Sequence, residues 1–328
     1  MPSDEGASAR RLSGSLWVVV ILTLAFGLFA WIGIGLTRDS GRVAALWIPN
    51  AIVLAAVLRA DKRTSIQFIG TAFLANCATN LLAGDGIGLA IGLSLTNTAE
   101  VLLALALLHY LSPAPLVMSK LADLCKLVAA SIFAPILSAC PAAIILASPG
   151  STFSADVWLS WVVSDGLGLL VVTPVMLIAI DAWRNRRTPT REELREWAIF
   201  VSIASAVSVA VFAQTRYPFL FLVGPISIVA AFRTGVLGTA VAVLIISVIA
   251  WIATLFGYGP VMLVRGDLST KLIVLQLFIA STFFMALPVA SALAGLAGMR
   301  RELRESRDTA QSILLGMRDV VFRADAAG

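Results

Sequence analysis

The sequence predicts an all-α polytopic integral membrane protein with about ten transmembrane helices and a C-terminal cytoplasmic helix. Three observations predict this class. Of the 328 residues, 59% are hydrophobic and only 13% are charged. The apolar residues form long runs, and about 20 such residues, each rising about 1.5 Å along a helix, cross a hydrocarbon core of about 30 Å. After Gly298 the composition changes abruptly, and 11 of the last 30 residues are charged.

Ten apolar runs follow one another, separated by short breaks that are charged or rich in Gly and Pro. The predicted spans are residues 15–37, 43–58, 65–83, 88–110, 125–147, 158–181, 197–214, 218–233, 235–256 and 271–295. The run from Leu16 to Leu36 is too long for the hydrophobic region of a cleaved signal. The membrane domain therefore occupies residues 15–295, after a short polar lead at 1–14.

The basic residues predict the orientation. With the N-terminus inside, 19 of the 24 Lys and Arg residues fall on the cytoplasmic side. Short cytoplasmic loops carry an excess of Lys and Arg, so both termini are expected in the cytoplasm. The net charge of +5 is thereby explained by topology, and it gives no reason to expect a nucleic-acid partner.

Two carboxylic acids lie inside predicted spans: Glu100 in the fourth and Asp165 in the sixth. An ionisable group at membrane depth is costly, which makes each a candidate functional residue. No basic residue lies within these spans to pair with them. The carboxyl groups are therefore expected to be protonated, hydrated or placed for a cationic or polar ligand.

Four asparagines accompany the acids, and Pro49 interrupts the second span directly before the first of them. The asparagines are Asn50, Asn76, Asn80 and Asn97. All fall at mid-depth or toward the outside, so they can line one cavity with the acids if the second, third, fourth and sixth spans are neighbours. In the alternative interpretation, these amides only join helices, through hydrogen bonds of about 0.6–2 kcal/mol each.

The sequence offers no sign of a cofactor, a metal site or a catalytic centre. His109 is the single histidine, and the three cysteines, Cys77, Cys125 and Cys140, are scattered along the chain. A zinc site of the usual N/S type needs four such ligands or three and a water, so none is expected. No phosphate-binding loop, nucleophile elbow or HExxH motif is present.

Residues 296–317 are predicted to form a helical connector. Six residues at alternating spacings of four and three share one face: Met299, Leu303, Ser306, Ala310, Ile313 and Met317. Such a seam is typical of a parallel two-helix contact in a homodimer. The alternative is a single amphipathic helix on the membrane surface. The stretch from Val320 to Gly328 is predicted to be a strand of five or six residues that runs into a turn, and it starts a further domain at 318–328.

Four motifs carry a resemblance to a known family. They are Leu46-Trp47-Ile48-Pro49-Asn50-Ala51, the stretch 73–82 with its two asparagines, Thr96-Asn97-Thr98-Ala99-Glu100, and Trp161-Val162-Val163-Ser164-Asp165-Gly166-Leu167-Gly168 through Thr173-Pro174. In this order they resemble the first type of bacterial membrane-associated sensor domain, the MASE family. The resemblance covers roughly residues 15–295, and the tail 312–328 resembles the entrance of a PAS domain.

The resemblance implies a sensory input domain in the bacterial inner membrane. Such domains precede PAS modules and then an enzyme of c-di-GMP turnover or a histidine kinase. No motif of those enzymes lies in this sequence. The expected ligand-binding or signalling residues are Trp47, Pro49, Asn50, Asn76, Asn80, Asn97, Glu100 and Asp165, and the expected partner is a small ligand, a lipid or a membrane protein. A cation- or proton-coupled transporter remains the alternative, although no two-fold repeat is evident.

Overall fold

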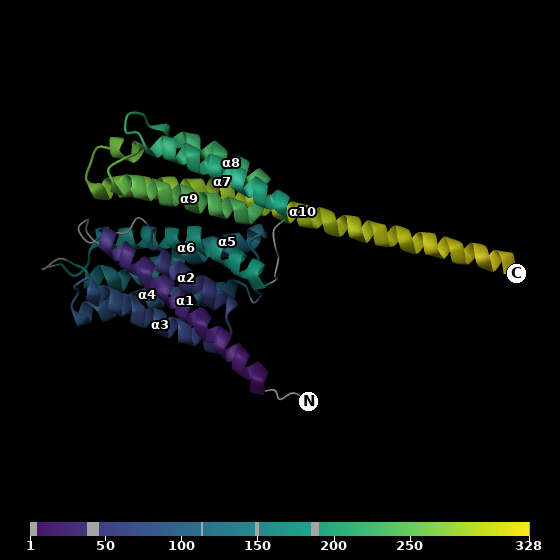
Figure 1. Ribbon diagram of the computed structural model, residues 1–328, viewed down its shortest axis with the longest axis horizontal. Coiled ribbons are helices and arrows are strands. Elements are labelled where there is room, and N and C mark those ends of the chain that lie inside the picture. Colours follow the sequence, from purple (N-terminus) through teal and green to yellow (C-terminus); the bar gives the residue numbers. More distant parts are fainter. Residues whose placement is uncertain (1–4, 38–45, 113, 148–150, 185–189, 328) are drawn as a thin grey trace.

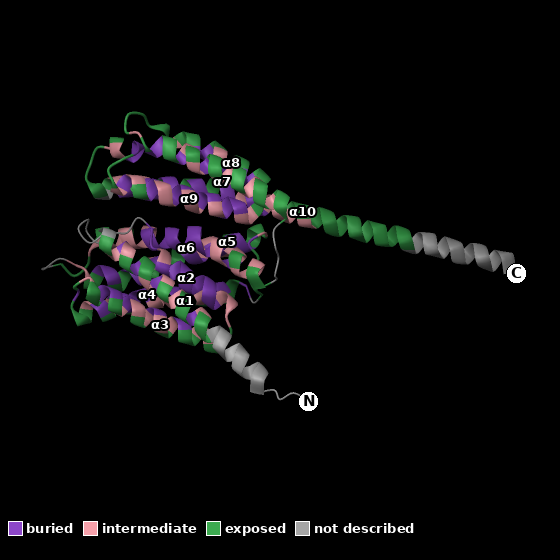
Figure 2. Ribbon diagram, in the orientation of Figure 1, coloured by how far each residue is buried: buried purple, intermediate pink, exposed green. Residues whose placement is uncertain are grey.

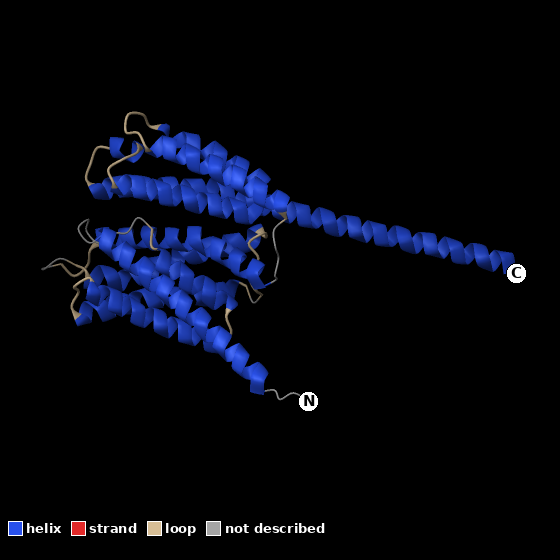
Figure 3. Cartoon of the chain, in the orientation of Figure 1, coloured by secondary structure: helices blue, strands red, loops and turns tan. Residues whose placement is uncertain are grey.

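The computed structural model describes residues 5–37, 46–112, 114–147, 151–184 and 190–327, and across them it contains helices and loops but no strand (Figure 3). The α-helices are α1 (Glu5–Thr37), α2 (Ile48–Arg59), α3 (Lys62–Leu82), α4 (Ile87–Leu111), α5 (Leu121–Ile145), α6 (Ala155–Arg184), α7 (Arg191–Phe212), α8 (Val223–Arg233), α9 (Gly235–Leu255) and α10 (Leu268–Ala327). Two short 3-10 helices, η2 (Phe219–Leu222) and η3 (Pro260–Leu263), complete the described elements. The all-α membrane class is therefore as predicted.

Each of the ten predicted runs is helical in the structure, and the run 218–233 contains both η2 and α8. Seven helices are long and apolar enough to cross a membrane: α1, α4, α5, α6, α7, α9 and α10. Helix α2 and the segment formed by η2 and α8 are apolar but shorter, as the two short runs predicted. Helix α3 has 21 residues, enough in length, but its Lys, Arg, Gln, Asn and Thr residues lower its hydropathy. The chain is a multi-pass membrane protein.

The helices form two groups, α1–α6 and α7–α10, whose axes run roughly alongside one another (Figure 1). In the first group α2 packs against α6, and α5 packs between α4 and α6. In the second, α9 contacts α7, α8 and α10. Where the groups touch, α6 meets α9 and α10, and α5 meets α10. The N-terminal end of α1 and the free end of α10 lie toward the same side of the molecule (Figure 1).

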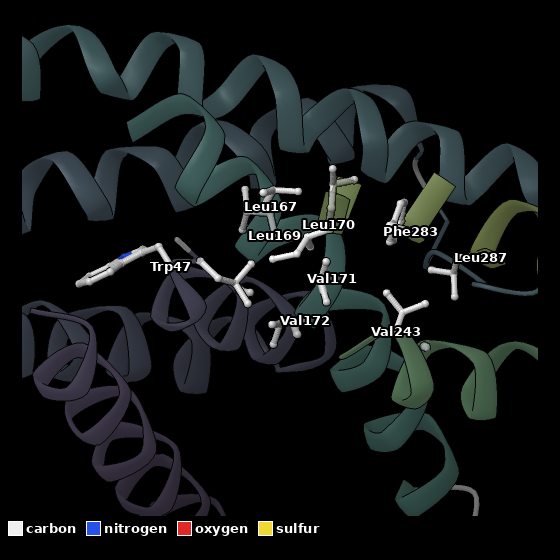
Figure 4. Close-up of a cluster of buried hydrophobic side chains, with 14 of the residues drawn as sticks. Trp47, Leu167, Leu169, Leu170, Val171, Val172, Val243, Phe283 and Leu287 are labelled. Carbon is white, nitrogen blue, oxygen red and sulfur yellow. The ribbon is translucent and has the colours of Figure 1, made fainter. Parts of the chain in front are cut away.

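Burial is greatest in the middle of the molecule (Figure 2). Nine consecutive residues of α2, from Pro49 to Val57, are buried, so this helix has no lipid-facing stripe. A second run, Leu167–Val172 of α6, is buried against both groups. There Val243 of α9 and Phe283 of α10 belong to the same apolar cluster (Figure 4).

Two boundaries differ from the prediction. Helix α1 begins at Glu5, within the predicted lead. Helix α10 continues without a break to Ala327, so the strand predicted to begin at Val320 is wrong. β-Branched residues favour strands only as a weak local preference. Extending a helix that already exists adds a hydrogen bond per residue without a new nucleation step, and this outweighs that preference.

Candidate functional site

The site is built around the first turn of α2. Trp47 is the residue before the helix, and Pro49 lies in its first turn, where the missing N–H group costs nothing. The backbone N–H of Trp47 donates to the carbonyl of Ser164 on α6 at 3.1 Å. Gly168 lies directly against the Trp47 backbone, where any side chain would collide. The start of α2 is thereby fixed against α6, and Asn50 comes next in the chain.

Asn50 joins three helices through one amide nitrogen. Its Nδ2 is 3.1 Å from Oδ1 of Asn97, 3.0 Å from Oε1 of Glu100 and 3.4 Å from Oδ2 of Asp165. Ser138 of α5 donates its hydroxyl to Oε2 of Glu100 at 2.9 Å. We call Asn50, Asn97, Glu100, Ser138 and Asp165 the polar cluster. It links α2, α4, α5 and α6 inside the first group.

The polar cluster is fully enclosed. Glu100 is 0% exposed, and its four companions are buried as well. Within the described part of the chain, no Lys, Arg or His is hydrogen-bonded or ion-paired with Glu100 or Asp165. An amide has only two N–H hydrogens, and Asn50 faces three acceptors. Asn50 alone therefore cannot satisfy all three acceptors, and a proton, a water molecule or a cation would complete the cluster.

A small cavity adjoins the cluster. Its lining comes from α1, α2, α3 and α4 and includes three asparagines, Asn50, Asn76 and Asn97. The space that the cavity leaves for a water-sized group is about 10 Å³, close to the volume that one water molecule needs. The Nδ2 atom of Asn76 has no hydrogen-bond partner among the described residues, although Asn76 is 1% exposed. A buried amide donor without a partner indicates a polar group at this point.

The predicted site residues thus separate into three sets. Asn50, Asn97, Glu100 and Asp165 are in direct contact. Asn76 lines the adjoining cavity, and Asn80 donates to its carbonyl and to its Oδ1, at 2.9 and 3.1 Å. Trp47 and Pro49 position the start of α2 and are absent from the lining of the cavity.

The connector residues project from the structure on α10. Met299 is 60% exposed and Leu303 72% exposed, and Ser306 and Ala310 are exposed too. The side chains of Ile313 and Met317 lie outside the described residues, although the helix backbone passes through both positions. An exposed apolar pair at this spacing leaves the predicted seam open to a second helix.

Sequence reasoning missed Ser138 and Arg59. Serine is frequent in membrane helices, so nothing marked Ser138 out before the fold was known. Arg59, at the end of α2, was counted only for topology. Its Nε and Nη2 contact the two carboxylate oxygens of Asp181 on α6 at 2.6 and 2.7 Å. The helix α2 is thus attached to α6 at both ends, and the polar cluster lies next to the first attachment.

Comparison with known proteins gives one finding. The model of the MASE1 family matches residues 18–295, most of the chain. No curated protein and no solved structure matches. The matched range includes every residue of the polar cluster and ends within α10.

Proposed function

The chain belongs to the MASE1 family of membrane sensory input domains of signalling proteins, and from this premise we propose that its polar cluster is where the stimulus is received. One observation carries the proposal: a single buried amide, that of Asn50, contacts two carboxyl groups from different helices that have no cationic partner in the described structure. A buried carboxyl group without a cationic partner responds strongly to a proton, a cation or a polar molecule, because nothing nearby neutralises its ionised form.

The adjoining cavity supports a small stimulus. It offers room for about one water molecule. Asn76 supplies an unused donor on one wall, and Asn50 and Asn97 connect the opposite wall to the carboxyl groups. Occupancy of the cavity, or a change of protonation beside it, alters how α2, α4 and α6 are held together. A coupling of about 1–3 kcal/mol is enough for a useful switch.

The output, on this proposal, leaves through α10 as a homodimer. The helix runs from the second group straight into the exposed connector, and its apolar face at Met299 and Leu303 fits a second copy. Cytoplasmic PAS and output modules, for c-di-GMP turnover or histidine kinase activity, would receive the signal. Both termini would then lie in the cytoplasm and the protein in the bacterial inner membrane, which agrees with their position on one side of the molecule.

Replacement of the acids in the full-length protein tests the proposal. We expect Glu100→Gln and Asp165→Asn each to change the basal signalling output about 5-fold or more, the size of a typical coupling. The matched control is Thr79→Val, because the hydroxyl of this buried residue bonds only to Ala75 in its own helix. Unchanged output in both acid variants, at wild-type membrane levels, would overturn the proposed site. Uptake of a cation into proteoliposomes would favour transport instead.

A further inference from the structure

The loop between α4 and α5 connects the end of α2 to α10. Arg59, the last residue of α2, donates from Nη2 to the carbonyl of Leu116 at 2.7 Å. Two residues later, the carbonyl of Met118 accepts a hydrogen bond at 2.8 Å from the hydroxyl of Ser291 on α10. One short segment is thus hydrogen-bonded to α2 of the first group on one side and to α10, the exit helix, on the other.

From these contacts we propose that residues 114–120, the coupling loop, transmit displacements of α2 to α10. The inference rests on the proposed function, since α2 carries Asn50 of the polar cluster. Asn50 and Arg59 are nine residues apart on a helix that is buried through most of its length, so the two ends move together. A shift at the cluster therefore reaches the Leu116 carbonyl with little loss.

The coupling loop is stiff enough to act as a link. Leu116 and Met118 are buried and anchor it in the protein. The backbone N–H of Val117 donates to Oδ2 of Asp123 at 3.0 Å, while Lys126 contacts the other carboxylate oxygen at 2.8 Å. A loop with buried side chains and a paired backbone moves as a unit, because bending it would break these contacts.

The exit helix, α10, contacts the coupling loop at a point where a displacement of the loop would move the helix. Ser291 and Gly295 are one helical turn apart, and a β-carbon at Gly295 would lie 3.5 Å from the carbonyl of Ser119. The backbone of α10 thus approaches the loop closely. Pro288, one turn before Ser291, removes a backbone donor from α10 and makes it easier to bend there.

Arg59 can also exchange partners. Its Nη1 atom is buried and has no hydrogen-bond partner among the described residues. A second acceptor can therefore bind the guanidinium group before the bond to Leu116 breaks. The unused donor would let the guanidinium group keep a hydrogen bond while the loop moves, and packed interiors change between discrete states rather than continuously.

Distances between spin labels test the link in the full-length protein in nanodiscs. Labels on Tyr110→Cys, at the end of α4, and Arg301→Cys, on the connector but off the predicted seam, report how α10 lies relative to the first group; both positions are exposed. The background carries Ser in place of Cys77, Cys125 and Cys140. An excess of unlabelled protein restricts the measurement to distances within one chain.

Glu100→Gln is expected to shift the mean distance by about 2 Å, the size of helix displacements in signalling transitions. Ser291→Ala should remove at least half of this shift, and Arg59→Lys should do the same from the other side of the loop. Ser281→Ala is the matched control, since this α10 hydroxyl bonds only to Phe278 of its own helix. It should leave the shift intact.

The outcomes separate the two proposals. A full shift that persists in both Ser291→Ala and Arg59→Lys overturns the coupling loop and leaves the sensory site standing. If Glu100→Gln alone causes no shift in the distance, the sensory site is overturned, and the coupling loop with it. Loss of the shift in Ser281→Ala as well as Ser291→Ala also counts against the loop, because the effect would then follow any lost hydroxyl on α10.

Discussion

Gly168 lies against the backbone carbonyl of Trp47, and this contact brings the start of α2 into register with the middle of α6. Gly166, two residues earlier, makes a similar approach to α5: a β-carbon there would lie 2.8 Å from the carbonyl of Ser131. The two glycines flank Leu167 and follow Asp165 directly. The spacing Asp-Gly-Leu-Gly therefore places a carboxyl group at the point where three helices come closest.

Gly168→Ala is expected to lower the free energy of unfolding by about 1–3 kcal/mol, because an added methyl group would force α2 away from α6. The thermal midpoint of the purified protein in detergent measures the loss. Gly70→Ala is the control, since a β-carbon at this exposed position of α3 meets nothing within 4 Å. Equal midpoints for the two variants would contradict the close approach at position 168.

Asn50→Ala should destabilise the protein by about 1–3 kcal/mol, since it leaves buried carboxyl oxygens of Glu100 and Asp165 without their shared donor. Asn80→Ala should cost less, because that amide donates only to Asn76 within the same helix. Denaturant unfolding of both variants in the same detergent provides the comparison. A larger loss for Asn80→Ala would show that the cluster is not held by Asn50.

Asp181→Asn should cost about 1–2 kcal/mol, since Arg59 would keep a buried charge without its carboxylate; the partial exposure of Asp181 limits the loss. The exposed pair of Arg233 and Glu196, at 3.5 Å, offers the control. Glu196→Gln should cost no more than about 0.5 kcal/mol. Thermal unfolding in detergent measures the loss of stability in each variant. Similar losses would contradict the prediction that the pair of Arg59 and Asp181 contributes more than the exposed pair.

Disulfide cross-linking tests the dimer seam on α10. In a protein free of its native cysteines, Leu303→Cys should cross-link between copies in membranes several-fold faster than Arg301→Cys. Residues two apart on a helix point in nearly opposite directions, so only one of the two faces the partner. Both positions are exposed, which equalises access of the oxidant. Equal rates, or none, would exclude a specific parallel seam at this level.

Much of the polar cluster could be predicted because buried charge is rare in a membrane and therefore conspicuous. Asn50, Asn97, Glu100 and Asp165 stood out by residue type, and their depths along the predicted spans already matched. The helices bring these four into contact. Their role in sensing remains a prediction, since contact alone does not reveal a ligand.

Other features could not be predicted because they depend on backbone atoms or on packing. The coupling loop is held through the carbonyl groups of Leu116 and Met118, and carbonyl groups leave no mark on the sequence. Ser138 could be assigned only once α5 was known to lie beside α4. The strand predicted to begin at Val320 was wrong because the prediction rested on the local preference of its residues and did not take account of the long helix that precedes them.

In the proposed function, the unbroken length of α10 determines how motion would reach the cytoplasm. Between Gly295 and Ala327 the helix extends for about 48 Å, taking about 1.5 Å per residue. It acts as a lever arm: a tilt of about 5° at the membrane surface sweeps its tip sideways by about 4 Å. An axial rotation of the helix, by contrast, has the same size at the tip as at its origin. This geometry therefore amplifies small changes of tilt but not rotations.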